Sequence, residues 1–220
     1  MTIGNVLSSA PLTHVLSRLG IRQGLSAGTP PTRDDTRVWS LSTLAGRMVE
    51  VSCDAVGASL TAAAALVLEA QHHAEPVVWI EAGSSGFYPP DVAAMGVDLN
   101  GLIVVRADST AKAARAADHL LRSSGFGLVV LDLSHDAHLA MSVQSRLSGL
   151  ANTHQAAVVC LTRKKTDSLS IGSLVSIRGQ TTVERGGFDQ FEWSIDIIKD
   201  KRRGPGWRHI GSCRGPEGLH

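Results

Sequence analysis

Apolar runs of strand length recur through the middle of the chain, separated by segments that suit helices. The runs are "MVEVS" (48–52), "PVVWIEA" (76–82), "GLIVV" (101–105), "GLVVLDL" (127–133) and "AVVCLT" (157–162), and the helical segments span 58–72, 89–95, 110–123 and 136–150. Strands buried on both faces consist of continuous apolar residues, and parallel neighbours need crossover helices. The pattern therefore predicts an α/β fold with a mostly parallel, twisted sheet flanked by helices.

The pattern changes after residue 172, where short β runs follow one another without room for helices. These runs are "SLVSIRG", "TTVERGG" and "FEWSIDIIK", joined by turns that contain glycine. In the last run apolar residues alternate with polar ones, which is typical of a strand buried on one face. We expect an antiparallel C-terminal β extension of the sheet.

The two ends of the chain differ from this middle part. Residues 5–20 can form a short lead helix with an apolar stripe, and 22–37 are rich in Gly, Pro, Ser and Thr, as in a linker arm. The stripe either packs on the core or docks in a partner's groove. The predicted organisation is a lead helix and arm over 1–43, a core domain over 44–211 and a flexible tail over 212–220.

Composition limits the function classes. The chain has 220 residues, 43% hydrophobic and 19% charged, as in one folded globular domain. A net charge of +1 excludes a role for the whole chain as a polyanion binder. Three widely spaced cysteines fit a reducing cytoplasm. No apolar run reaches the roughly 18 residues that span a bilayer, so we expect a cytoplasmic protein without membrane insertion.

Residues 49–70 predict a strand, a turn and a helix, the arrangement that carries a phosphate-binding loop. The pattern G-x-x-x-x-G-K-[ST] uses backbone amides and Lys for phosphate and a hydroxyl for magnesium. Here Gly57 and Ser59 match, whereas Ser52 replaces the first Gly and Ala58 replaces the Lys. Asp132 lies near the end of "GLVVLDL", where a magnesium-binding carboxylate is expected.

The missing lysine decides the energetics of this loop. A charge-assisted hydrogen bond contributes about 1.5–3 kcal/mol, so its loss weakens phosphate binding on the order of ten- to a hundred-fold. Asp54 adds a negative charge beside the same place. We therefore expect a degenerate loop that does not hydrolyse nucleotide, with no cofactor and no catalytic residue.

The chain from Leu44 to about Gly211 resembles the ATPase core of the RecA recombinases, over roughly three quarters of its length. The resemblance lies in "EPVVWIEAGSSGFYPPDVAAMGVDLNGLIVVRADSTAKAARAADHLLRSSGFGLVVLDL" and in "IIKDKRRGPGW". Where RecA has a catalytic glutamate this chain has Gly83, with Glu81 on the strand, and Thr162 replaces the glutamine that couples nucleotide to DNA. One missing catalytic group lowers a rate by about 10²–10³.

As a short RecA-like sequence with a degenerate loop, this chain is similar to the ImuA family. The resemblance implies a non-catalytic adaptor in damage-induced mutagenesis by translesion DNA synthesis, part of the SOS response. It implies contacts with RecA and with ImuB, an inactive relative of the Y-family polymerases, and through them with an error-prone polymerase. Two alternatives are an ATP-dependent, recombinase-like DNA enzyme and a division inhibitor resembling SulA.

Two basic stretches are candidates for DNA or partner contacts. The first, in "TRKKTDSLSIGS", contains Arg163, Lys164 and Lys165, which suit phosphate contacts without sequence readout. No aromatic residue is near to stack a base, so we expect weak or no direct DNA binding, and the alternative is a solvated loop.

The second stretch is the most basic part of the chain, "KDKRRGPGWRHIGSCRGPEGLH". Its candidate contacts are Lys199, Lys201, Arg202, Arg203, Trp207 and Arg208. Trp207 suits an interface anchor, since Trp and Arg are enriched at binding hot spots. The alternative is a basic strand end followed by a frayed tail.

Two further constellations are weaker. "DLSHDAH" places His135 and His138 at a metal-compatible spacing, but an acidic first turn of a helix starting at Ser134 or His135 explains it better. Ser59, His135 and Asp132 would make a hydrolase triad, yet no G-x-S-x-G turn supports it. We expect neither a metal site nor a hydrolase.

Overall fold

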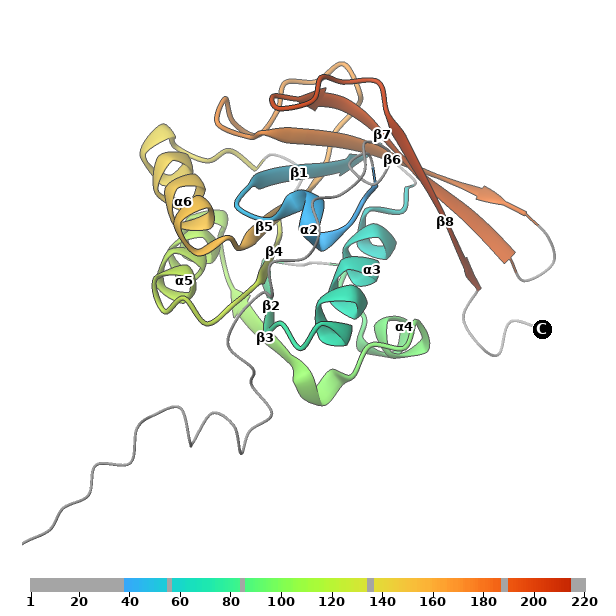
Figure 1. Ribbon diagram of the computed structural model, residues 1–220, viewed down its shortest axis with the longest axis horizontal. Helices are drawn as coiled ribbons and strands as arrows, with labels where there is room; N and C mark the ends of the chain where they lie inside the picture. The colour runs from blue at the N-terminus through green and yellow to red at the C-terminus, as the bar shows by residue number, and fades with distance from the viewer. Residues whose placement is uncertain (1–37, 55–56, 84–85, 134–136, 187–189, 215–220) are drawn as a thin grey trace, which may run out of the picture.

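A computed structural model describes residues 38–54, 57–83, 86–133, 137–186 and 190–214. These residues form an eight-stranded sheet in the order β3-β2-β4-β5-β1-β6-β7-β8 (Figure 1). The strands are β1 (Met48–Cys53), β2 (Val77–Ala82), β3 (Leu102–Ala107), β4 (Leu128–Asp132), β5 (Ala157–Arg163), β6 (Ile177–Arg185), β7 (Gln190–Asp200) and β8 (Arg208–Arg214). The predicted lead helix and arm lie outside the described residues.

The sheet has a parallel half and an antiparallel half. The first six strands in this spatial order, from β3 at the edge to β6, pair in parallel. β7 pairs antiparallel with β6, and β8 pairs antiparallel with β7. The predictions of a mostly parallel α/β sheet and of an antiparallel C-terminal extension are confirmed. β7 also has the expected alternation, because Trp193, Ile195 and Ile197 are buried while the residues between them are partly exposed.

Helices cover both faces of the parallel half (Figure 1). They are α2 (Leu41–Leu44), α3 (Ser59–His72), α4 (Pro89–Ala94), α5 (Thr110–Arg122) and α6 (Met141–His154), with a short 3-10 helix η2 (Leu99–Gly101). In β4, Leu128 and Val130 pack against the face with α3, while Val129 and Leu131 pack against the face with α5 and α6. Both faces of the strand are buried, which is why the run is continuously apolar.

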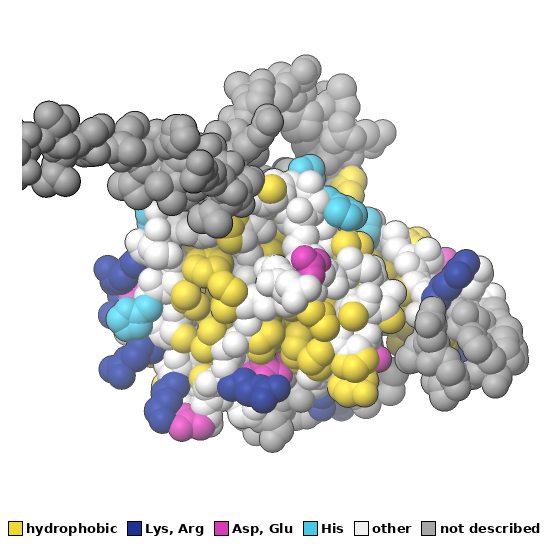
Figure 2. Space-filling model, turned by 90° about the horizontal axis from the view of Figure 1, so that it is seen from below, with side chains coloured by type: hydrophobic (Ala, Val, Ile, Leu, Met, Phe, Trp, Pro, Cys, Tyr) yellow, Lys and Arg dark blue, Asp and Glu magenta, His cyan; other side chains and the backbone are white. Residues whose placement is uncertain are grey.

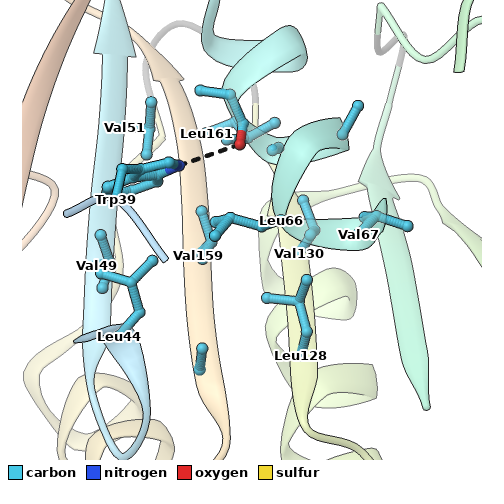
Figure 3. Packing of buried hydrophobic residues seen from close by; sticks show 14 of the residues in the cluster. Trp39, Leu44, Val49, Val51, Leu66, Val67, Leu128, Val130, Val159 and Leu161 are labelled. Atoms are coloured by element: carbon cyan, nitrogen blue, oxygen red, sulfur yellow. Dashed lines mark hydrogen bonds between the residues drawn. The ribbon is translucent and has the colours of Figure 1, made fainter. Parts of the chain in front are cut away.

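The core begins earlier and ends later than the predicted 44–211. Trp39 is 4% exposed and its indole Nε1 donates a hydrogen bond to the Ala62 carbonyl of α3 at 3.1 Å. Figure 3 shows this indole lying beside Val51 and above Leu44. At the other end β8 continues to Arg214, so 212–214 belong to the sheet rather than to a tail.

The start of α6 is also corrected. The helix begins at Met141, not at Ser134 or His135, and has no acidic residue in its first turn. Ala137 and Leu139 precede it and are buried in the core, so the chain runs over the α5 and α6 face before it turns into the helix. The Gln144 side chain donates to the Leu139 carbonyl at 2.6 Å and holds this approach in place.

The free edge of β3 exposes apolar side chains. Ile103 is 50% exposed and Val104 is 37% exposed, and Leu99 in η2 is 40% exposed. Figure 2 shows hydrophobic side chains gathered across the middle of this side of the molecule, with Lys and Arg along one flank. Arg106, paired with Glu81 at 3.0 Å, places a charge on the edge, a common protection of edge strands against pairing.

Candidate functional site

A pocket of about 260 Å³ lies at the carboxyl ends of β1, β4 and β5. Ligands of open α/β sheets bind at this edge of the strands. The described residues that line it are Cys53, Gly57, Ser59, Leu60, Gly86, Asp132, Leu133, Leu161, Thr162 and Arg163. The structure therefore brings together three residues of the degenerate loop prediction, Gly57, Ser59 and Asp132.

The other two residues of that prediction do not line the pocket. Ser52 is fully buried, and its hydroxyl donates to the Gln180 side chain at 2.9 Å. Ala58 is 3% exposed and precedes the first residue of α3. A methyl group stands where the phosphate-binding pattern has its lysine.

The backbone at Gly57 packs tightly on β1 and β6. A Cβ at Gly57 would lie 2.2 Å from the Cys53 Cβ and 3.1 Å from the Thr181 carbonyl oxygen, so only glycine fits there. The Ser59 hydroxyl lies 3.5 Å from the Cys53 sulfur. The hydroxyl expected to hold magnesium thus has a thiol as its neighbour. Residues 55 and 56 lie outside the described residues.

Arg163 supplies the positive charge among the described lining residues. The Arg163 Nη2 would lie 3.7 Å from a Cβ at Gly86. Arg163, a candidate for DNA or partner contacts in the loop after the apolar run, is instead the last residue of β5 and faces the pocket. Its position follows from the length of β5, which extends one residue beyond the predicted apolar run.

A fully buried carboxylate, Glu50, lies behind this pocket in the centre of the sheet. It accepts hydrogen bonds from the Thr162 hydroxyl at 3.0 Å, the Ser170 hydroxyl at 2.5 Å and the Ile171 amide at 2.9 Å. Thr162 also lines the pocket, so the two features share a side chain. Glu50 is not among the site residues predicted from the sequence, although a charge inside a run buried on both faces is itself a signal, because such a charge must be paired.

Two cations face Glu50. The Lys164 Nζ lies 3.6 Å from its carboxylate and the Arg178 Nε 3.9 Å from it. Arg178 also donates to the backbone carbonyls of Ser168 and, at 2.8 Å, of Lys165. Glu50 and Arg178 together hold residues 164–176, which we call the 164–176 loop, against the sheet.

The three consecutive cations at 163–165 therefore occupy three environments. Arg163 lines the pocket, Lys164 is 15% exposed and faces Glu50, and Lys165 is exposed. The three candidate contact residues are thus not presented together at one surface, because Lys164 faces the buried carboxylate of Glu50.

The C-terminal basic stretch is divided in the same way. Trp207 is 6% exposed and its Nε1 donates to Asp200 at 3.4 Å, so it is a core residue and not a surface anchor. Lys199 is half-buried, and burial followed by the charge of Lys201 lowers the pKa of its ammonium. Arg208 pairs with Asp196, its Nη2 at 2.8 Å.

The remaining candidates of that stretch lie at the surface. Arg202 and Arg203 are exposed in the turn after β7, and the Lys201 ammonium donates to the Ser173 carbonyl at 2.7 Å. This contact joins the turn to the 164–176 loop. Two basic segments that are far apart in the sequence are thus neighbours.

Neither a metal site nor a membrane span is found in the described part of the chain. It contains no group of three or more His, Cys, Asp or Glu side chains that could hold a metal ion. His135 and Asp136 lie outside the described ranges, and His138 is exposed. Among the described helices, none has the length and apolar character that crossing a bilayer requires.

Comparison with models of known families gives no match, and a search of curated proteins gives none either.

Proposed function

We propose that the chain is a non-catalytic adaptor of the ImuA kind, acting in damage-induced mutagenesis through contacts with RecA and an ImuB-like inactive polymerase. The observation that carries the proposal is the buried Ala58 at the start of α3, where a phosphate-binding loop needs its lysine. An α/β core without that cation suits contacts with proteins better than turnover of nucleotide.

Further support comes from the way the pocket is built. The Ser59 hydroxyl is next to the Cys53 thiol, and Gly57 is packed against β1 and β6. Gly83, where RecA has its catalytic glutamate, carries no side chain to activate a water. The resemblance of the sequence from Leu44 to Gly211 supplies the choice of partners.

One observation favours the alternative of an ATP-dependent enzyme. Arg163 brings a guanidinium to the pocket that also contains Asp132, and guanidinium groups bind phosphate well. This cation comes from β5 and not from the loop that precedes α3. We expect it to support weak anion binding without hydrolysis.

The test measures both properties with the purified full chain. We expect binding to RecA or to the ImuB-like polymerase of the same organism, and ATP turnover that is the same for the wild type, Asp132→Ala and Arg163→Ala. Turnover that disappears in either variant would establish the ATPase alternative. If the chain binds neither protein, the adaptor role is excluded. Binding to the tubulin-like division protein instead would favour the SulA-like inhibitor.

A further inference from the structure

Leu169 is the most exposed large apolar side chain in the described residues, at 88%. An isolated exposed leucine has no meaning by itself. This one differs because the backbone on both sides of it is held. Arg178 binds the Ser168 carbonyl, and the Ser170 hydroxyl donates to Glu50 at 2.5 Å. The buried polar groups thus fix the loop in a shape that projects the leucine into solvent.

The backbone of Leu169 itself is also held. Its carbonyl accepts a hydrogen bond from the Lys164 ammonium at 3.4 Å, and Ile171, two residues later, is 1% exposed in the core. A side chain on a fixed backbone loses less conformational freedom when it binds than one on a mobile loop. The backbone therefore holds the Leu169 side chain in its exposed position before any partner binds.

A second exposed apolar residue touches the same loop. Met141, at the start of α6, is 57% exposed, and its sulfur accepts a hydrogen bond from the Ser173 hydroxyl at 3.7 Å. The 164–176 loop is thus associated with two exposed apolar side chains, one at its middle and one near its end.

The charges around the loop are mostly positive. Lys165 is exposed on it, and Lys201 donates to its Ser173 carbonyl. Lys199 is partly exposed, two positions before Lys201. The acidic residue of the loop itself is Asp167, which is exposed two positions before Leu169. A partner with carboxylates around an apolar pocket complements this surface.

We propose that Leu169 inserts into an apolar pocket rimmed by carboxylates on a protein partner, with Lys165 and Lys201 facing that rim. The inference rests on the proposed function, which names the two candidate partner proteins. A protein is favoured over nucleic acid because Asp167 would face a phosphate backbone beside the leucine, and because Lys164 and Arg178 are already used inside the molecule.

The experiment measures the dissociation constant of the full chain with RecA and with the ImuB-like polymerase. We expect Leu169→Ala to weaken binding to one of them by about tenfold or more. Lys165→Glu should slow association, with a smaller effect at high salt. Ile210→Ala is the matched control, since Ile210 is 54% exposed on β8, and it should bind as the wild type does.

Thermal unfolding shows whether the variants are folded, and an unchanged midpoint is expected for a side chain as exposed as Leu169. If the wild type binds a partner and Leu169→Ala binds it within twofold, the inference is overturned while the proposed function stands. If the wild type binds neither protein, both fail. Loss of binding to a single-stranded DNA oligonucleotide in Leu169→Ala, with protein binding unchanged, would assign the loop to nucleic acid and overturn the proposal.

Discussion

Arg47 and Asp200 form a buried ion pair, in which two single residues contribute strongly to the stability of the fold. The Arg47 Nη2 lies 2.5 Å from the Asp200 carboxylate, with both side chains at most 1% exposed. Burial lowers the pKa of the Arg47 guanidinium, and the bond to Asp200 opposes this. Burial raises the pKa of Asp200, but hydrogen bonds from Arg47 and the Arg202 amide outweigh it and lower the pKa overall.

Asp200→Asn is expected to destabilise the protein strongly, because it leaves a buried guanidinium without its counter-charge. A loss of about 3–5 kcal/mol in the free energy of unfolding is typical of such a change. Urea unfolding near neutral pH measures it. The exposed pair Arg208–Asp196 provides the control, since Asp196→Asn should cost less than about 1 kcal/mol. Equal losses in the two variants would contradict the assignment.

The pH dependence of stability follows from the lowered pKa of Asp200. A carboxylate with a depressed pKa stabilises the folded state above its ordinary value of about 3.9, and this contribution is lost as the pH falls below that value. The difference in unfolding free energy between wild type and Asp200→Asn should therefore shrink below about pH 4. A difference that stays constant down to about pH 3 would show that the charge of Asp200 is not the cause.

At the scale of elements, the 164–176 loop takes the place of a helix beside β1 and β6. It is held by Glu50 and Arg178 and contacts α6, where the Gln144 side chain accepts a hydrogen bond from the Leu174 amide at 3.1 Å. The loop carries both Leu169 and the contact to Lys201. Polar contacts thus set its shape together with the buried Ile171 and Val175, whereas α3 and α5 are held mainly by apolar packing.

Glu50→Gln should make local opening of the 164–176 loop more frequent, while the strands of the sheet stay paired. The variant keeps a hydrogen-bonding group but leaves Lys164 and Arg178 without a negative partner. Hydrogen exchange at the Ile171 amide, which donates to Glu50 at 2.9 Å, is expected to accelerate by about tenfold or more. Peptides from β2 and β4 report global unfolding, and exposed Glu192→Gln is the control. Unchanged protection of Ile171 would contradict this role for Glu50.

At the scale of the whole molecule, the two halves of the sheet should open at different free energies. Cys160 lies fully buried in the central strand β5, where burial and then the charge of Glu50 raise the pKa of its thiol. Cys213 lies on the edge strand β8 and is half-buried, with its pKa raised by burial. The edge strand β8 pairs only with β7, whereas the central strand β5 pairs with β4 on one side and with β1 on the other.

A thiol reagent should therefore modify Cys213 well before Cys160. Labelling of Cys160 is expected at the rate of global unfolding, since exposing the centre of the sheet requires its neighbours to separate. Mass spectrometry of peptides after timed labelling measures both rates. Comparable rates for the two thiols in native buffer would show that the sheet opens as a unit.

The sequence predicted the parallel strands and the antiparallel extension because both depend on local periodicity. It could not predict features set by contacts between distant residues. Trp207, in a basic, glycine-rich stretch, is buried in the apolar core, where Asp200 accepts its indole hydrogen. Lys164 is turned inward by Glu50, and Arg163 reaches the pocket because β5 is one residue longer than its apolar run. The sequence pattern located the degenerate loop but not the residues from distant strands that complete its pocket.

The ion pair between Arg47 and Asp200 has a consequence for synthesis on the ribosome, because its members are 153 positions apart in the chain. Arg47 emerges first, and the acid that neutralises it emerges only when β7 has been translated. Until then, closing the interior around β1 would trap a lone guanidinium away from water. The nascent polypeptide should therefore keep this part of its interior open until β7 has been synthesised, and close it only then.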